Sequence, residues 1–166
     1  MRSQFFDGFD FAEYKFSIVA VEHVDEFFNI EKYGLHPVIY DESCLRGYAC
    51  IFGFTEDKHL ALHKLFTNNN GRPAPSINGI EPVPFHSPAG DLRYDLELAI
   101  PYSGSILIAN GFIQKYFVPF GFQIPHAFKK VYELTFDQGL FVRVEDRSEA
   151  ARQLRIEYKE PLPPEK

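Results

Sequence analysis

The segment KKVYELTFDQGLFVRVED, residues 129–146, constrains the fold more than any other part of the chain. Over 131–136 it alternates between two sets of side chains with period two, which is typical of a β-strand. Asp137, Gln138 and Gly139 then supply a turn, and an apolar run follows over 140–144. The segment therefore predicts a β-hairpin.

Several other segments have the same strand-like character, being rich in alternating, β-branched or aromatic residues. Those at 94–100 and 105–109 are separated by Pro-Tyr-Ser-Gly and are expected to pair as a second hairpin. The segment 46–55 is apolar or small on both faces, which predicts a central strand. The expected strands outside the 129–146 hairpin are 14–21, a short one at 38–40, 46–55, 94–100 and 105–109.

The segment 55–67 can be interpreted in two ways. Thr55, Glu56 and Asp57 resemble a helix start and Asn70-Gly71 a helix stop. Period two, however, is satisfied around Leu60 and Leu62, and residues 56–58 make a link of hairpin length. We favour a strand over a helix here.

These elements together predict a mainly β domain of seven or eight strands, an antiparallel sandwich or barrel, spanning residues 1–158. Short helices are expected after Asn110 and from Asp146 to Leu154. Residues 159–166 are polar and Pro-rich and are expected to form a frayed tail.

Composition excludes several classes of function. A net charge of −6 repels phosphate backbones, so no nucleic acid is expected as a partner. Acidic residues at 7, 10 and 13 interrupt any secretion signal, and the longest uncharged stretch, 98–114, is too short and too broken to span a membrane. The sequence therefore predicts a cytoplasmic protein that does not contact membranes.

Two irregular segments are candidate binding surfaces. Residues 68–90 contain five prolines and several turn signals, and connections this long are often functional. Residues 116–128 combine five aromatic rings with two prolines and no formal charge, and either seal the end of a sheet or form an aromatic lip for a partner. The candidate binding residues are Phe85, Tyr116, Phe117, Phe120, Phe122 and Phe128.

The candidate catalytic residues are His86, Asp91 and His126, because a histidine beside a carboxylate can transfer protons at neutral pH. No cofactor or metal is expected. His59 and His63 could share a metal ion from a helix, but on a strand they would lie ~13 Å apart.

Cys44 and Cys50 are expected to be reduced, buried thiols, and the chemistry of a nucleophile would require a lowered pKa and a nearby base.

The stretches RGYACIFGF, HLALHKL, PYSGSILIANGF and YELTFDQGLFVRV give the chain a resemblance to a group of uncharacterised bacterial proteins. The similarity covers about half of the chain in short pieces. It implies a β-rich bacterial protein, supports a strand at Leu60 and Leu62, and implies no activity.

The leading functional prediction is a non-catalytic binding module that uses the 68–90 and 116–128 segments. Its partner would be a protein, and an antidote-like role against a basic toxin fits a small acidic domain. One alternative is a small hydrolase or lyase with His86 or His126 as base and Asp91 as acid or orienting group. A second is a β-barrel that holds a small apolar ligand.

Overall fold

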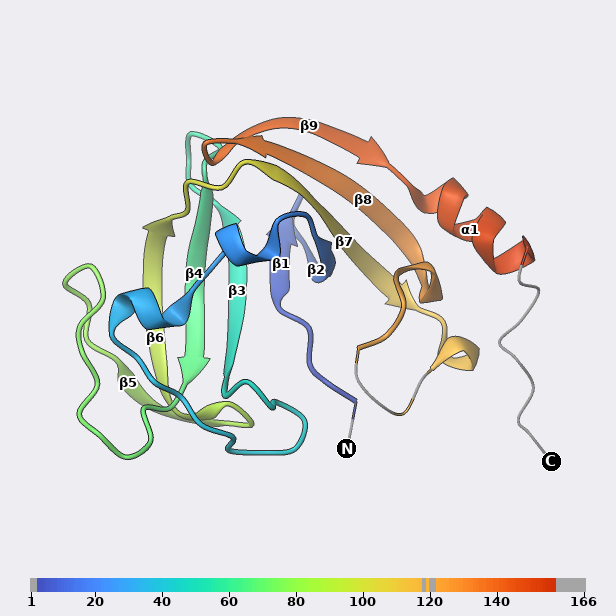
Figure 1. Ribbon diagram of the computed structural model, residues 1–166. Coiled ribbons are helices and arrows are strands. Elements are labelled where there is room, and N and C mark those ends of the chain that lie inside the picture. Colours follow the sequence, from blue (N-terminus) through green and yellow to red (C-terminus); the bar gives the residue numbers. More distant parts are fainter. Residues whose placement is uncertain (1–2, 118, 120–121, 158–166) are drawn as a thin grey trace.

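The fold is a single mixed sheet of nine strands, seen in a computed structural model that describes residues 3–117, 119 and 122–157 (Figure 1). The strands are β1 (Gly8–Phe11), β2 (Tyr14–Val21), β3 (Tyr48–Phe54), β4 (Leu60–Thr67), β5 (Val83–Ser87), β6 (Gly90–Ala99), β7 (Gly104–Phe112), β8 (Phe128–Asp137) and β9 (Leu140–Asp146). An α-helix, α1 (Ser148–Glu157), follows β9.

The strand order is β5-β6-β4-β3-β1-β2-β7-β8-β9. All neighbouring pairs are antiparallel except β1 and β3, which run parallel over a short register, Gly8 with Ile51 and Phe9 with Phe52. The prediction of a mainly β, largely antiparallel fold is confirmed, but the sheet is mixed and has nine strands rather than seven or eight.

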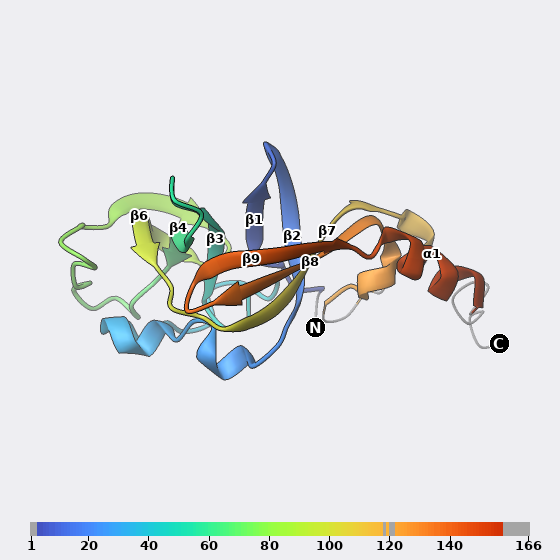
Figure 2. The ribbon, with the colours of Figure 1, turned by 90° about the horizontal axis from the view of Figure 1, so that it is seen from above.

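The sheet is strongly curled, so that β8 and β9 arch back toward the β3–β4 turn (Figures 1 and 2). His59 and Leu140 form an isolated bridge there, the Leu60 amide donates to the Gly139 carbonyl at 2.8 Å, and the Phe141 amide donates to Lys58 at 3.1 Å. Rings of β3 also pack on those of β8 and β9, since Phe54 contacts Phe136 and Phe141, but across the described ranges of the chain no ladder joins the edge strands β5 and β9. The predicted closed barrel is therefore wrong, and a second packed sheet, as a sandwich requires, is not shown.

The main core combines aliphatic side chains with aromatic rings that come from both halves of the curled sheet. Phe27, next to the 3₁₀ turn η1 (Val24–Glu26), packs on Phe52 and Tyr102 with ring centroids 4.8 and 4.9 Å apart. A second 3₁₀ turn, η2 (Ile30–Tyr33), adds the buried Ile30. These rings pack on the concave side of the curled sheet.

The strands expected at 14–21, 46–55, 55–67 and 129–146 are confirmed, the last as the β8–β9 hairpin. The expected hairpin of 94–100 with 105–109 is wrong, because β6 pairs with β4 and β5 whereas β7 pairs with β2 and β8. Ile100 and Tyr102 are buried in the connection, which crosses from one half of the sheet to the other.

Three other expectations need correction. Residues 38–40 form no strand, and the region 68–90 contains β5 and the first residue of β6. After Asn110 the chain continues as β7 to Phe112 and then makes only a 3₁₀ turn, η3 (Gln114–Tyr116). The expected helix from Asp146 is present as α1, and the tail 159–166 lies outside the described residues.

A buried asparagine joins the loops below β4. The Asn68 side-chain oxygen accepts from the backbone amides of Val38 and Asn70, and its amide nitrogen donates to the carbonyls of Val38 and Ala89 at 2.8 and 2.9 Å. Asn69 holds the adjacent chain in the same way, through the amide of His36. Residues 36–38 therefore need no strand partner to be fixed.

Candidate functional site

The face of β2, β7, β8 and β9 opposite the main core carries three parallel rows of side chains. Register places Glu22, Ser105, Thr135 and Arg143 in a polar row, because the Glu22 amide donates to the Ser105 carbonyl and Ser105 pairs with Thr135. The second row is mixed: Ala20, Leu107, Glu133 and Glu145. The third row, Ala109, Val131 and Arg147, is apolar up to its last residue.

Helix α1 stands over the third row because its first turn is tied to β8. The Arg147 amide donates to the Val131 carbonyl at 2.7 Å, and the Ser148 hydroxyl accepts from the Val131 amide at 3.0 Å. Asp146 accepts from the Ser148 amide at 2.8 Å, as a helix-capping side chain does. Further along, Arg155 donates to the carbonyls of His126 and Phe128.

A small second core lies beneath α1. Ala151 from the helix packs with residues from β7, β8, η3 and a fourth 3₁₀ turn, η4 (Pro125–Ala127). Its buried members are Ala109, Tyr116, Ala127, Phe128, Val131 and Ala151. This core fixes the helix and η4 at a distance from the first two rows, which remain uncovered.

The result is a groove of about 900 Å³ between α1 and η4 on one side and the strands on the other. Its floor carries Ala20 and Leu107, and its wall carries Pro125, Ala150 and Leu154. Its other end is polar and contains Glu22, Ser105, Glu133, Arg143 and Arg147. The groove therefore suits a ligand with an apolar part and a charged part.

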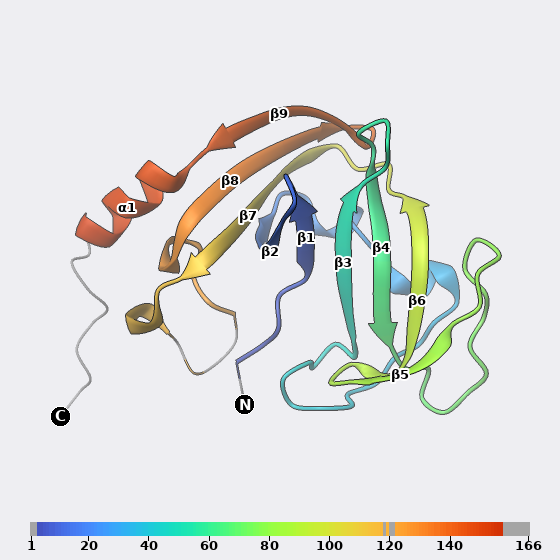
Figure 3. The same ribbon diagram turned by 180° about the vertical axis from the view of Figure 1, so that it is seen from behind.

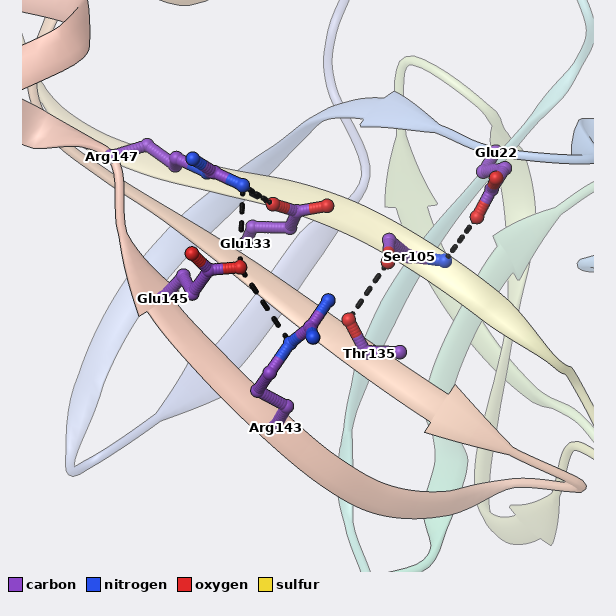
Figure 4. Close-up of polar contacts among 7 residues, drawn as sticks. All are labelled: Glu22, Ser105, Glu133, Thr135, Arg143, Glu145 and Arg147. Atoms are coloured by element: carbon purple, nitrogen blue, oxygen red, sulfur yellow. Dashed lines mark hydrogen bonds and ion pairs between the residues drawn. The ribbon is translucent and has the colours of Figure 1, made fainter.

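Where the chain is described, some charged side chains at the polar end are paired with arginines and one, Glu22, is not (Figure 4). Arg147 donates to Glu133 through Nε at 2.9 Å and Nη2 at 2.5 Å, and also to Glu145 at 3.2 Å. Arg143 lies 3.6 Å from Glu145. These two arginines and two glutamates balance, and the Arg147 hydrogen bond holds the pKa of Glu133 below its usual value.

Glu22 lies outside this balanced group. Its carboxylate accepts from the Ser105 amide at 2.9 Å, and in the described part of the chain its only ion pair is with His23, at 3.7 Å. Its side chain is 55% exposed. The groove therefore has a residual negative charge at the Glu22 end.

A second cavity, of about 320 Å³, shares Ala20 and Val21 with the groove. It exists because β1 covers β2 only over Tyr14–Ser17, so that Ala20 and Val21 pair on one side alone, with β7. Phe6, Phe28 and Phe122 line it, and Arg46, paired with Asp7, closes one side. Apolar surface thus continues from the groove around the open part of β2.

The structure places two of the predicted catalytic residues, His86 and Asp91, on paired strands and the third, His126, elsewhere. His86 lies in β5 and Asp91 in β6 at one edge of the sheet, and the ring of His86 packs against Tyr40. His126 lies in η4, beside β7 and β8, and lines the groove. His126 therefore lies apart from His86 and Asp91, and the enzyme hypothesis stays a prediction.

The aromatic residues predicted to form one binding surface do not all lie on one surface of the molecule. Tyr116 and Phe128 are buried in the second core, whereas Phe117 and Phe122 are exposed, at 47% and 51%. Phe85 lies in β5, where Arg93 stacks over its ring at 4.9 Å. Phe120 lies outside the described residues. The 68–90 loop and the 116–128 segment occupy opposite sides of the molecule (Figures 1 and 3).

The surroundings of the two cysteines and of the pair His59 and His63 can be compared with the predictions for them. Cys44 and Cys50 are free and buried, as expected, and burial raises the pKa of both thiols. His63 lies in strand β4 and His59 directly precedes it. The two residues are therefore not in a helix, which the metal-binding interpretation required. Among the described residues, no cluster of three or more His, Cys, Asp or Glu could hold a metal ion.

Sequence reasoning missed the principal groove residues Glu22, Leu107, Glu133, Arg143 and Leu154. The alternation over 131–136 does put Glu133 on one face with Val131 and Thr135. Nothing in the sequence reveals that β2 and β7 continue this face, because that neighbourhood depends on long-range strand pairing.

Comparison with known proteins adds no relative: no family model, curated protein or solved structure matches the chain. The fold and groove define a β-sheet protein with an open amphipathic groove. Within the described range no helix has the length and apolar character needed to cross a membrane. The resemblance to bacterial proteins stays a prediction.

Proposed function

We propose that the protein is a non-catalytic binding module whose groove holds an extended, basic segment of a partner protein. The observation that carries the proposal is the groove beneath α1, with an apolar floor and wall at one end and the uncompensated Glu22 at the other. A cationic side chain of the partner would pair with Glu22 while apolar side chains cover Leu107 and Leu154.

Charge supports a basic partner over an acidic one. The chain has a net charge of −6, and its field attracts basic surfaces and repels acidic ones. Within the groove, Arg143 and Arg147 are already paired with glutamates. An anionic ligand would have to compete with those glutamates, whereas a cationic ligand meets Glu22, which has no ion pair with an arginine or lysine among the residues that the structure describes.

Proton-transfer chemistry receives less support from this groove. Glu133 is the candidate proton donor in the groove, since its carboxylate is one of the two in the lining, beside Glu22. Its lowered pKa keeps it ionised at neutral pH, so it is a poor proton donor there. The groove is therefore better suited to binding than to acid catalysis.

The test is selection of random peptides of about 12 residues displayed on phage against the full chain. We expect enrichment of peptides that combine Lys or Arg with apolar residues. Glu22→Gln keeps the hydrogen-bond acceptor for Ser105 but removes the charge, and should weaken binding of the selected peptides about tenfold. Leu154→Ser, at a partly exposed wall position, should weaken it to a similar degree.

Matched controls are Glu97→Gln on β6 and Ile156→Ser on α1, which are exposed and lie outside the groove lining. Both should bind like the unsubstituted protein. Enrichment of acidic or purely apolar peptides would contradict the proposal, and so would binding that is insensitive to Glu22→Gln and Leu154→Ser. A set of peptides with no measurable affinity would also contradict it.

A further inference from the structure

The two edges of the sheet differ in how well they are protected. β5, at one edge, has five residues and contains Pro84, which cannot donate to a further strand. β9, at the other edge, has seven residues without proline, and its Val142 and Val144 are 58% and 43% exposed. Only β9 therefore presents an edge suited to pairing with another strand.

The direction of the free backbone groups of β9 follows from its pairing with β8. Because Arg147 donates to Val131, and Arg143 and Glu145 lie in the same register, these alternate residues point their amides and carbonyls toward β8. The intervening Val144 therefore points its amide and carbonyl away from the sheet. At the start of the strand the edge is already used, since Phe141 donates to Lys58.

The sequence around Val144 is self-complementary. In an antiparallel pair of two β9 strands related by a two-fold axis at Val144, each Val144 amide faces the Val144 carbonyl of the second copy. The neighbouring position then sets Arg143 opposite Glu145 of the second copy, twice by symmetry. Both side chains are well exposed, at 61% and 41%, and can reach across the strand gap.

We propose that the chain forms a homodimer through the β9 edge, centred on Val144, which joins two sheets into one. The charge pattern selects the second copy as the occupant, because one register satisfies both ion pairs and places two exposed valines against each other. The paired stretch is short, since Lys58 blocks its start and α1 follows its end. The dimer is therefore weak and depends on protein concentration.

Sedimentation velocity of the full chain from about 1 to about 500 μM tests the proposal, with a dimer expected at the upper end. Val144→Pro removes the central amide but leaves the β8 ladder intact, because the lost donor faces outward. We expect this variant to keep its circular dichroism spectrum and to be a monomer throughout. Val38→Thr, at an exposed position in the loop that Asn68 holds and outside every strand, is the control and should dimerise normally.

Charge exchange gives a test that does not depend on proline. Arg143→Glu alone and Glu145→Arg alone each place like charges opposite one another and should raise the dimer dissociation constant at least about tenfold. The double variant R143E/E145R restores both pairs and should recover the dimer. A monomer at every concentration, a dimer unaffected by Val144→Pro, or a double variant no better than the single ones would overturn the proposal.

Discussion

The side chain of Asn68 hydrogen-bonds backbone groups that elsewhere in the molecule are paired between strands. Its side chain is bonded to residues from three separate segments, around Val38, Asn70 and Ala89, and it is only 4% exposed. Polar groups buried to this degree cost free energy unless they are hydrogen-bonded. Asn68 therefore stabilises the loops at the lower end of β4 through its complete set of partners.

Replacing Asn68 by Ala should lower the free energy of unfolding by about 3 kcal/mol, because it leaves the Val38 and Ala89 groups without their partner. Chemical denaturation of the two proteins measures the difference. Asn70→Gly is the matched control, since Asn70 is exposed and has a positive φ that glycine adopts readily. Equal losses in the two variants would contradict the role assigned to Asn68.

The sequence shows why this residue is hard to identify in advance. The run Asn68-Asn69-Asn70-Gly71 resembles a turn, and Asn70 and Gly71 do adopt positive φ values. The partners of Asn68 lie 30 residues before it and 21 after it. Local patterns carry no information about contacts at such separation, so the turn was predictable and the buried hydrogen-bond network was not.

At the scale of elements, the position of α1 depends on Arg147 and its bonds to β8. Glu133 and Glu145 lie opposite one another in β8 and β9, a like-charge pair that is unfavourable by itself. Arg147 lies against both and removes the repulsion. The groove wall formed by α1 is therefore coupled to the protonation of Glu133.

Glu133→Gln tests this coupling through pH. The folded-state pKa of Glu133 is lowered, so its contribution to stability is present above the unfolded pKa of about 4.3 and is lost as the pH falls through the folded value. The variant should be less stable than the unsubstituted protein at pH 7, and the difference should shrink as the pH falls below about 4.3 and vanish once the pH is below the folded-state pKa of Glu133. Thermal unfolding followed across this range measures it.

A matched variant for this experiment is Glu97→Gln on β6, an exposed carboxylate for which the structure shows no arginine partner among the described residues. It should change stability little at any pH. A Glu133→Gln difference that is constant with pH would show that the Arg147 pair does not hold the helix.

Local patterns identified several strands correctly: alternation for β3, β4 and β8, β-branched and aromatic composition for β2, and the turn at Asp137–Gly139 followed by an apolar run for β9. Local patterns could not show that β6 and β7 pair with different strands, because pairing depends on contacts that are distant in the sequence. In the structure, Ile100 and Tyr102 are buried in the segment that connects β6 to β7. This segment crosses the core, so that β6 and β7 belong to different halves of the sheet.

At the scale of the whole molecule, the groove is a product of topology. Its floor combines strands from residues near 20, 107 and 133, and its wall comes from the helix after β9. The sequence placed the binding surface on two irregular segments, which the structure sets on opposite sides (Figure 3). Only the long-range register brings the groove residues together, and no single segment contains enough of them to signal a site.

Hydrogen exchange of the full chain, measured by mass spectrometry with and without a selected basic peptide, tests the central claim most directly. The account predicts added protection in the residues near 20–22, 105–107 and 150–154, with no change in β5 and β6. Protection confined to β5, β6 and the 68–90 loop, or no protection while the peptide is bound, would contradict it.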